Sequence, residues 1–335
     1  MVKIEWFDLD SNVVQEYLNK AVSHIEIQYG RHHSHLTKSI KDKVFCDNTG
    51  KFSKKKVKRF LQSTRQELKE QDFFYNYMQN PHLSKRCEKA IKKIINYNMI
   101  HYQRGTTNNK YTLHQVLLSS LNFDCCPYCN RQYITSYRDT SRIRHTTADL
   151  DHFYPKSIYP LFALSLFNFV PSCQICNSRM KKDDWKDCLY PYEESFGDDA
   201  VFRISEADKT DKKSDEYYQK LLDAFLGKSD GEFSIVIDNM AADSILQQRI
   251  DNSKKLFKLE EVYQTHQEYV RELLIKQRIY DEGAYLDMLR DQFAKYGLSF
   301  GDTELELFLY GFRWDDVDHH TRPLSKLTYD IIKRQ

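Results

Sequence analysis

The residues with the clearest chemical pattern are two pairs of cysteines. Cys126 and Cys129 are separated by two residues, and Cys173 and Cys176 repeat this spacing farther along the chain. Four thiolates spaced in this way are typical of a tetrahedral zinc site, which leaves no coordination position for water. The pattern therefore predicts a structural Zn²⁺ that ties two loops together and contributes folding energy. Cys125 is expected to take no part, because it would break the two-residue spacing.

The segment around these pairs contains side chains that suit the hydrolysis of a phosphodiester bond. This reaction requires a base that activates water, oxygen ligands for Mg²⁺ or Mn²⁺, and cations that meet the phosphate charge. His152 can serve as the base, while Asp151 and Asn177 offer oxygen ligands. The basic residues placed to contact phosphates are Lys156, Arg179 and Lys181.

Simpler roles compete with this interpretation. Asn177 could cap the helix expected after Cys176, and a lone histidine is more often structural than catalytic. Asp149 is interpreted as a solvated strand residue rather than a third metal ligand. The position of His152 next to Asp151 and between the cysteine pairs favours the catalytic interpretation.

These residues follow one order along the chain: Cys126-x-x-Cys129, Asp151-His152, Asn168 and Cys173-x-x-Cys176-Asn177. The order resembles the zinc-braced form of the HNH endonuclease (ββα-metal) motif, over about residues 121–183. The resemblance implies a β-hairpin that carries Asp151 and His152, and a helix beginning near Cys173 that carries Asn177. It further implies that His152 is the general base, that Asp151 and Asn177 bind one divalent ion, and that Asn168 holds the loop that orients His152. The implied products have 5′-phosphate and 3′-hydroxyl ends.

A narrower resemblance rests on the strings CPYCNRQY, LDHFYPKS and CQICNSRMK. They are similar to the HNH effector subunits of bacterial anti-phage systems of the Septu and retron type. This resemblance implies a defence nuclease that works with an ATPase subunit. Because an unrestrained nuclease would endanger its host, we expect such a partner to restrain or position it through the C-terminal helices.

Charge is distributed unevenly along the chain. Residues 31–110 contain 19 Lys and Arg against 6 Asp and Glu, whereas residues 182–335 contain 22 against 33. The basic region is expected to attract nucleic acid, and the acidic region to repel it. Lys85, Lys89 and Lys92 share one face of a helix expected after Pro81, and they are predicted to bind nucleic acid.

Low glycine and proline contents, 10 and 7 in 335 residues, favour a helix-rich fold. Apolar residues recur at helical spacing in 12–28, in 57–68 after a cap at Ser53, and from Asp243 onward. The seam in the last segment is expected to pack in an antiparallel hairpin of the same chain, with a seam between subunits as the alternative.

The expected architecture is mainly α with a small α+β insert. A basic helical nucleic-acid-binding region (1–110) precedes the nuclease core with its zinc site (111–190), and a mainly helical, acidic region follows (191–335), where a partner could bind. The longest mostly apolar stretch is too short to cross a bilayer, and the N-terminal MVKIEWFDLD lacks the apolar run of a signal peptide. A cytoplasmic location is therefore expected.

Two functions follow from these patterns. The favoured one is a metal-dependent endonuclease acting on DNA or RNA. The alternative is a non-catalytic, zinc-scaffolded module that binds nucleic acid or a protein. An inert scaffold has no need for Asp151, His152 and Asn177 beside its zinc, so the residues favour the enzyme.

Overall fold

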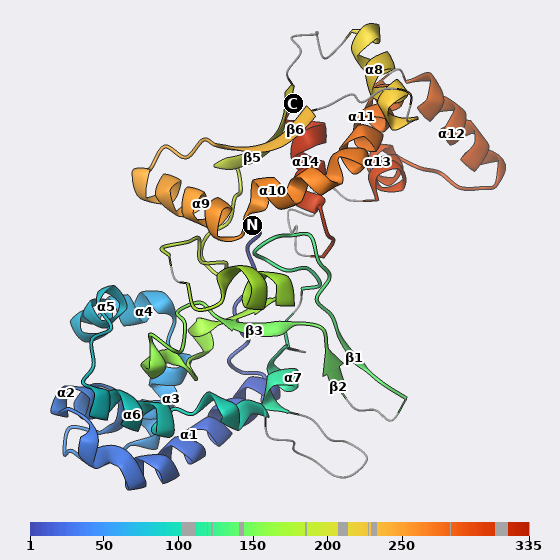
Figure 1. Ribbon diagram of the computed structural model, residues 1–335. Coiled ribbons are helices and arrows are strands. Elements are labelled where there is room, and N and C mark those ends of the chain that lie inside the picture. The colour runs from blue at the N-terminus through green and yellow to red at the C-terminus, as the bar shows by residue number, and fades with distance from the viewer. Residues whose placement is uncertain are drawn as a thin grey trace. The chain divides into compact units, whose positions relative to one another are not determined.

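The chain is mainly helical in a computed structural model, with 56% helix and 10% strand (Figure 1). This content confirms the expected fold class. The structure describes residues 1–101, 112–118, 120–121, 123–140, 144–184, 186–206, 214–226, 228, 233–281, 283–311 and 321–334. The chain forms two compact units, which we call the N-terminal unit (residues 4–126 and 133–185) and the C-terminal unit (residues 1–3, 127–132 and 186–335).

Helices form the larger part of the N-terminal unit, with two short hairpins. Its elements, with η marking 3₁₀- and π-helical segments, are α1 (Asn12–His32), η1 (His33–His35), α2 (Lys38–Ile40), η2 (Lys41–Phe45), α3 (Lys54–Gln62), α4 (Arg65–Lys69), α5 (Asp72–Gln79), α6 (Lys85–Ile94), η3 (Tyr97–His101), α7 (Leu113–Leu118), β1 (Ser136–Arg138), β2 (Arg144–Thr146), β3 (Asp149–His152), η4 (Pro160–Phe162), η5 (Leu166–Asn168), β4 (Phe169–Ser172) and η6 (Ile175–Lys181).

Local capping sets where the first helices begin. The side chains of Ser11, Ser53 and Ser84 each accept a hydrogen bond from a backbone N–H in the first turn of α1, α3 and α6. The helix expected after Ser53 is shorter than predicted, because Thr64 forms a capping box with Glu67 and starts α4 as a separate helix. Apolar faces of α3 and α6 both pack on α1, and the three helices lie together in the unit (Figure 1).

The hairpin of β3 and β4 carries the central motif. The strands are antiparallel, and Asp151 lies opposite Val170 while His152 lies opposite Phe169. The π-helical η6 follows β4 after a short link, with Asn177 in its first half. The hairpin thus precedes the helical segment, and together they carry Asp151, His152 and Asn177.

The C-terminal unit combines one hairpin with helices. Its elements are β5 (Ala200–Glu206), α8 (Asp215–Phe225), β6 (Phe233–Asn239), α9 (Ser244–Leu256), α10 (Leu259–Tyr263), η7 (Gln264–His266), α11 (Gln267–Asp281), α12 (Ala284–Lys295), α13 (Asp302–Tyr310) and α14 (Ser325–Lys333). Strands β5 and β6 pair along their whole length, and buried residues alternate along β6 as a sheet with one covered face requires.

The long helix expected from Asp243 is broken. Lys258 adopts a left-handed conformation with φ of 46°, which ends α9 and lets the chain restart as α10. The seam residues Leu256, Leu259, Tyr263, Val270 and Leu273 are buried. Helix α11 packs on α8 and α14 of the same unit, so helices of this chain cover the seam there.

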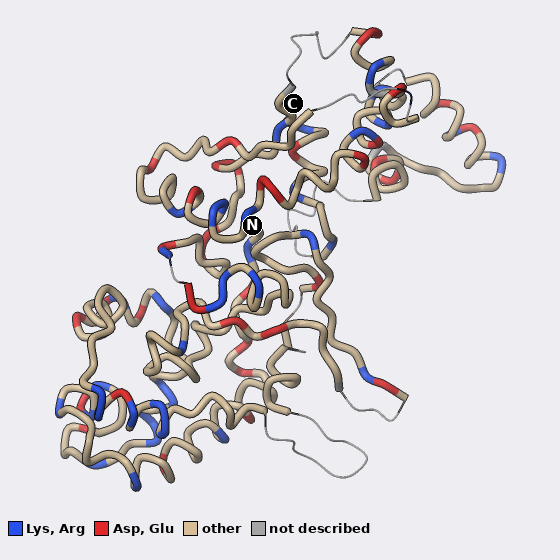
Figure 2. Tube along the Cα trace, in the orientation of Figure 1, with Lys and Arg blue, Asp and Glu red and all other residues tan. Residues whose placement is uncertain are grey.

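Basic residues gather on the helical part of the N-terminal unit. Figure 2 shows Lys and Arg along α2, α3 and α6. The side chains of Lys85, Lys89 and Lys92 are exposed on α6, although Lys92 pairs with Glu88. Among the described residues, no helix combines the length and the apolar character needed to cross a membrane.

Candidate functional site

The two predicted cysteine pairs lie together. The Sγ atoms of Cys126, Cys129, Cys173 and Cys176 all lie within 4.8 Å of one another, and all four residues are buried. The backbone N–H of Cys176 donates to the Sγ of Cys173 at 3.4 Å, a contact that stabilises a thiolate. Cys125 is buried but does not belong to this group, as its position in the sequence predicts. Four clustered thiolates fit a structural Zn²⁺ site.

His152 is held in one orientation. Its Nε2 lies 3.1 Å from the backbone oxygen of Ala163, and its ring is only 5% exposed. Because a carbonyl oxygen only accepts, Nε2 must carry the proton, and Nδ1 keeps a lone pair. Tyr97 and Phe169 pack edge-on against the imidazole, with ring centroids 4.4 and 5.4 Å away. These contacts leave the nitrogen that can accept a proton fixed in direction.

Asn168 fixes the loop that supplies this carbonyl. The fully buried amide accepts a hydrogen bond from the N–H of Tyr154 at 2.7 Å, and it donates to the carbonyls of Tyr154 and Phe162 at 3.0 and 3.2 Å. Phe162 immediately precedes Ala163, whose oxygen holds His152. Asn168 is therefore linked to His152 through the loop that carries Phe162 and Ala163.

Asp151 and Lys181 form a buried ion pair. The Nζ of Lys181 donates to Oδ1 of Asp151 at 3.0 Å and to the backbone oxygen of His152 at 2.6 Å, and both side chains are at most 4% exposed. The predicted phosphate contact of Lys181 is therefore wrong, because this lysine neutralises Asp151 from inside the protein. A carboxylate accepts at about four positions, so the pairing leaves Asp151 able to bind a metal ion as well.

Asn177 and Asp149 meet at the same pocket. The Nδ2 of Asn177 donates to Oδ2 of Asp149 at 2.9 Å, and the Oγ of Ser178 lies 3.4 Å from the same oxygen. This pairing orients the Asn177 amide and leaves its oxygen as the group that can bind a cation. Asp149 lies in β3, as the sequence predicts, and is half-buried at the pocket.

A pocket of about 400 Å³ brings these groups together. Asp149, Asp151, His152 and Asn177 line one part of it. The remaining lining includes five side chains that the sequence did not single out as functional: Tyr97, His101, His114, Lys182 and Asp183. Lys182, which follows η6 and has a positive φ of 50°, lines the pocket, whereas the adjacent Lys181 is buried.

Burial keeps two side chains of the pocket, Tyr97 and His114, in their uncharged forms. Burial and the nearby carboxylates of Asp149 and Asp151 raise the pKa of Tyr97, so its hydroxyl stays protonated. Burial lowers the pKa of His114 to about 4, with a further contribution from His101. At neutral pH, His114 is therefore a neutral imidazole beside the acidic residues.

The oxygen atoms in this pocket fit a hard divalent cation. Mg²⁺ prefers carboxylate and amide oxygens and keeps several of its waters, so few protein ligands suffice. Asp151 and Asn177, with Asp149 beside them, offer that donor set. Within the described part of the chain, the four cysteines are the one group in which three or more His, Cys, Asp or Glu ligand atoms lie within 4.8 Å. The pocket therefore offers an open set of oxygen donors, whereas the cysteine cluster is closed and offers only sulfur.

The other predicted phosphate contacts are accessible. Lys156 is exposed, lines the pocket and lies over the ring of Tyr97 with its Nζ 5.1 Å from the centroid. Arg179 is exposed on η6. Their binding to nucleic acid stays a prediction.

The buried imidazole gives the protein an expected dependence on pH. Burial, together with Lys156 and Lys181, lowers the pKa of His152 from 6.5 to about 3, although the bond to Ala163 opposes the shift. In the unfolded chain His152 is protonated below about pH 6.5, whereas in the folded chain it stays neutral down to about pH 3. The free energy of unfolding should fall with decreasing pH in this window, by about 1.4 kcal/mol per pH unit.

Urea unfolding at a series of pH values, without added divalent metal, measures this slope. His152→Gln keeps a donor for the Ala163 carbonyl and removes the titrating group, so its slope should be smaller by about the same 1.4 kcal/mol per pH unit. Equal slopes for the variant and the wild type would contradict a neutral, buried His152.

Comparison of the chain with models of protein families, with curated proteins and with solved structures finds no match.

Proposed function

We propose that this chain is a divalent-metal-dependent endonuclease that hydrolyses phosphodiester bonds in nucleic acid. The observation that carries the proposal is the state of His152: neutral, with its proton held on Nε2 by Ala163 and with Nδ1 available as a base. Its neighbours in the same pocket, Asp149, Asp151 and Asn177, are the oxygen donors that such a reaction requires.

The residues at this site have separate roles in the proposed reaction. His152 takes a proton from water through Nδ1 as the water oxygen attacks phosphorus. The bond between phosphorus and the leaving oxygen breaks, the leaving oxygen takes up a proton from solvent, and His152 returns its proton to solvent. Asp151 and Asn177 would hold Mg²⁺ or Mn²⁺, which would supply charge stabilisation for the phosphate. Asn168 and Lys181 position the base and the carboxylate, and they contact neither water nor phosphate.

Zn²⁺ in the cysteine cluster is proposed to be structural. Four thiolates fill a tetrahedral coordination sphere, so a zinc ion there stabilises the loops and has no position for substrate. The resemblance to Septu and retron effectors supports a role in anti-phage defence, with an ATPase subunit as partner. The acidic region 191–335 is the proposed place for that contact, because it is unsuited to nucleic acid.

Incubation of the purified protein with plasmid DNA, single-stranded DNA and total RNA tests the proposal. Cleavage is expected when Mg²⁺ or Mn²⁺ is present and should be lost without added metal. If no substrate is cut with either ion, even with the co-purified partner, the proposal fails. Retained nucleic-acid binding in that case would favour the non-catalytic zinc-scaffolded module.

Helix α6 is expected to hold the nucleic-acid backbone. Exchange of Lys85, Lys89 and Lys92 for glutamate should weaken binding and should reduce the slope of log affinity against log salt by about 2 to 3, because each lost phosphate contact removes about 0.7 to 0.9. Fluorescence anisotropy over a range of salt concentrations measures both quantities.

A charge-matched variant serves as the control. Lys228, Lys255 and Lys295 are exposed in the C-terminal unit, and their exchange for glutamate makes the same change in net charge. This variant should keep the wild-type slope. Equal losses of affinity in the two variants would contradict a role of α6 in binding nucleic acid.

A further inference from the structure

A second pocket adjoins the one that holds His152. It has a volume of about 290 Å³, and Tyr97, Lys156 and Asp183 line both pockets. Ala163, whose carbonyl fixes His152, forms part of its wall. A ligand in this second pocket would therefore lie one loop away from the proposed base.

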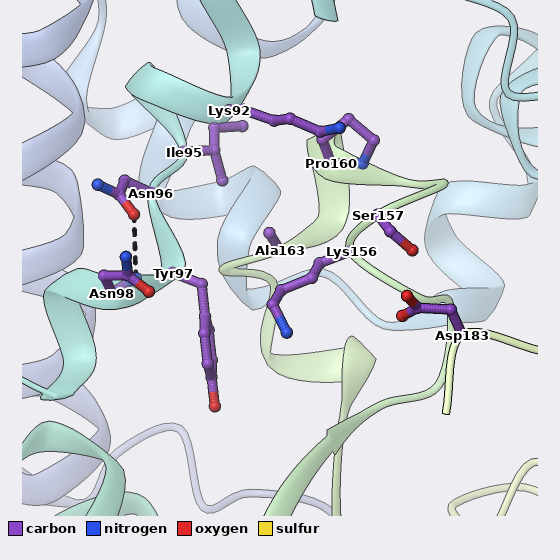
Figure 3. Close-up of a pocket in the computed structure, with 10 residues that line it drawn as sticks. All are labelled: Lys92, Ile95, Asn96, Tyr97, Asn98, Lys156, Ser157, Pro160, Ala163 and Asp183. Carbon is purple, nitrogen blue, oxygen red and sulfur yellow. Dashed lines mark hydrogen bonds between the residues drawn. The ribbon is translucent and has the colours of Figure 1, made fainter. Parts of the chain in front are cut away.

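The lining combines apolar, amide and cationic groups with the hydroxyl of Ser157 and the carboxylate of Asp183, as Figure 3 shows. Ile95, Pro160 and Ala163 provide apolar surface, and the ring of Tyr97 adds an aromatic wall. The amides of Asn96 and Asn98 lie at one end, where Asn96 Oδ1 accepts the backbone N–H of Asn98 at 3.0 Å. That bond holds Asn96 in place, with its NH₂ group as a donor to a ligand.

Cations lie on either side of this apolar surface. Lys156 reaches toward the Tyr97 ring, and Lys92, which also pairs with Glu88, extends from α6 over Pro160 (Figure 3). A planar ring with polar edges and a negatively charged group on each side matches this arrangement. A nucleobase in a strand has these properties. The pocket volume of about 290 Å³ lies just below the range of about 300–1,000 Å³ for drug-sized ligands, which suits a single base.

We propose that this pocket binds one unpaired nucleobase next to the scissile phosphate, so the substrate is single-stranded or locally unpaired nucleic acid. The inference rests on the proposed nuclease function and names its substrate class. A base in a duplex is stacked and paired, and its removal from the helix costs a few kcal/mol. A strand that is already unpaired binds without that cost. Phosphate contacts alone would bind a strand with bases and a strand without bases equally well.

Binding to the His152→Ala protein without added metal tests the pocket independently of catalysis. The probes are short labelled DNA and RNA strands, the same sequences as duplexes, and strands of equal length that lack all bases. The single strand of at least one nucleic acid should bind about tenfold more tightly than its duplex and than the strand without bases.

Ser157→Trp provides the structural test. Ser157 is exposed and lines the second pocket, so an indole at this position should occupy the space for the base. In the His152→Ala background, the substitution should remove the advantage of the single strand. Ser39→Trp, at an exposed position on α2, is the matched control and should retain it.

The outcomes separate this inference from the proposed function. Equal affinity for single strand and duplex, equal affinity with and without bases, or no change in Ser157→Trp would each overturn the base pocket. Those results leave metal-dependent cleavage by the wild type untouched. Conversely, if the cleavage assay contradicts the nuclease proposal, tighter binding of single strands than of duplexes would still show that the pocket binds a base.

Discussion

Replacement of His152 by alanine is expected to lower the rate of metal-dependent cleavage by about 10²- to 10⁴-fold, the usual contribution of a positioned base. The reason is the fixed tautomer: Ala163 binds the proton on Nε2, so Nδ1 is the nitrogen that can accept a proton. Among the described residues, His114 lies in the same pocket but has no hydrogen bond to a backbone carbonyl that would fix its tautomer. Burial also lowers the pKa of His114 to about 4.

His152→Gln separates chemistry from structure. The ring of His152 packs between Tyr97 and Phe169, so its truncation to alanine also leaves a cavity. Glutamine fills part of that space and can donate to Ala163, yet it cannot take up a proton. Both variants should therefore show a similar loss of cleavage rate, and His152→Gln should unfold at a temperature closer to that of the wild type. Substantial cleavage by His152→Gln would remove histidine from the role of base.

Replacement of Cys173 by serine is expected to cause loss of bound zinc and of stable folding. Structural Zn²⁺ sites have apparent binding free energies of about 10–16 kcal/mol in small domains, comparable to the whole stability of a protein. The four thiols are buried within 4.8 Å of one another, and without a metal ion this arrangement adds no binding free energy to the folded state. Elemental analysis for zinc and thermal unfolding followed by circular dichroism measure the two effects.

Cys125→Ser is the matched control for this experiment. Cys125 is as buried as its neighbour Cys126 but lies outside the cluster, so its substitution should keep the zinc content of the wild type. A Cys173→Ser protein that is zinc-free and as stable as the wild type would contradict a structural zinc site. Equal zinc loss in the two variants would instead assign the effect to general disruption of the hairpin.

The variants at His152 and Cys173 should affect cleavage for different reasons, the first through chemistry and the second through folding. Loss of the base should leave zinc content unchanged, because His152 Nε2 bonds to a backbone oxygen and not to the cysteines. Loss of zinc should reduce activity indirectly, since β4 leads into the Cys173 turn and from there into η6, which carries Asn177. Cleavage measured at several zinc loadings would therefore follow the folded fraction.

The local pattern of residues determined the parts of this protein that depend on short-range order. The spacing of two residues within each cysteine pair predicted the thiol cluster, and serine caps with periodic apolar residues predicted the starts of the early helices. The predicted break-free helices failed where backbone conformation changes locally, at Thr64 and Lys258. A capping box can be read from the sequence, whereas a left-handed lysine leaves no pattern in it.

Tertiary structure alone decided which groups face the pocket. Lys181 and Lys182 are adjacent in the sequence and both are basic, yet one is buried against Asp151 and the other lines the pocket. Tyr97 reaches His152 from a segment far away in the chain, and it also forms the wall of the second pocket. Such contacts depend on long-range packing of α6 and η3 against the hairpin loop, and packing is set by the shapes of many side chains together, which no local spacing records.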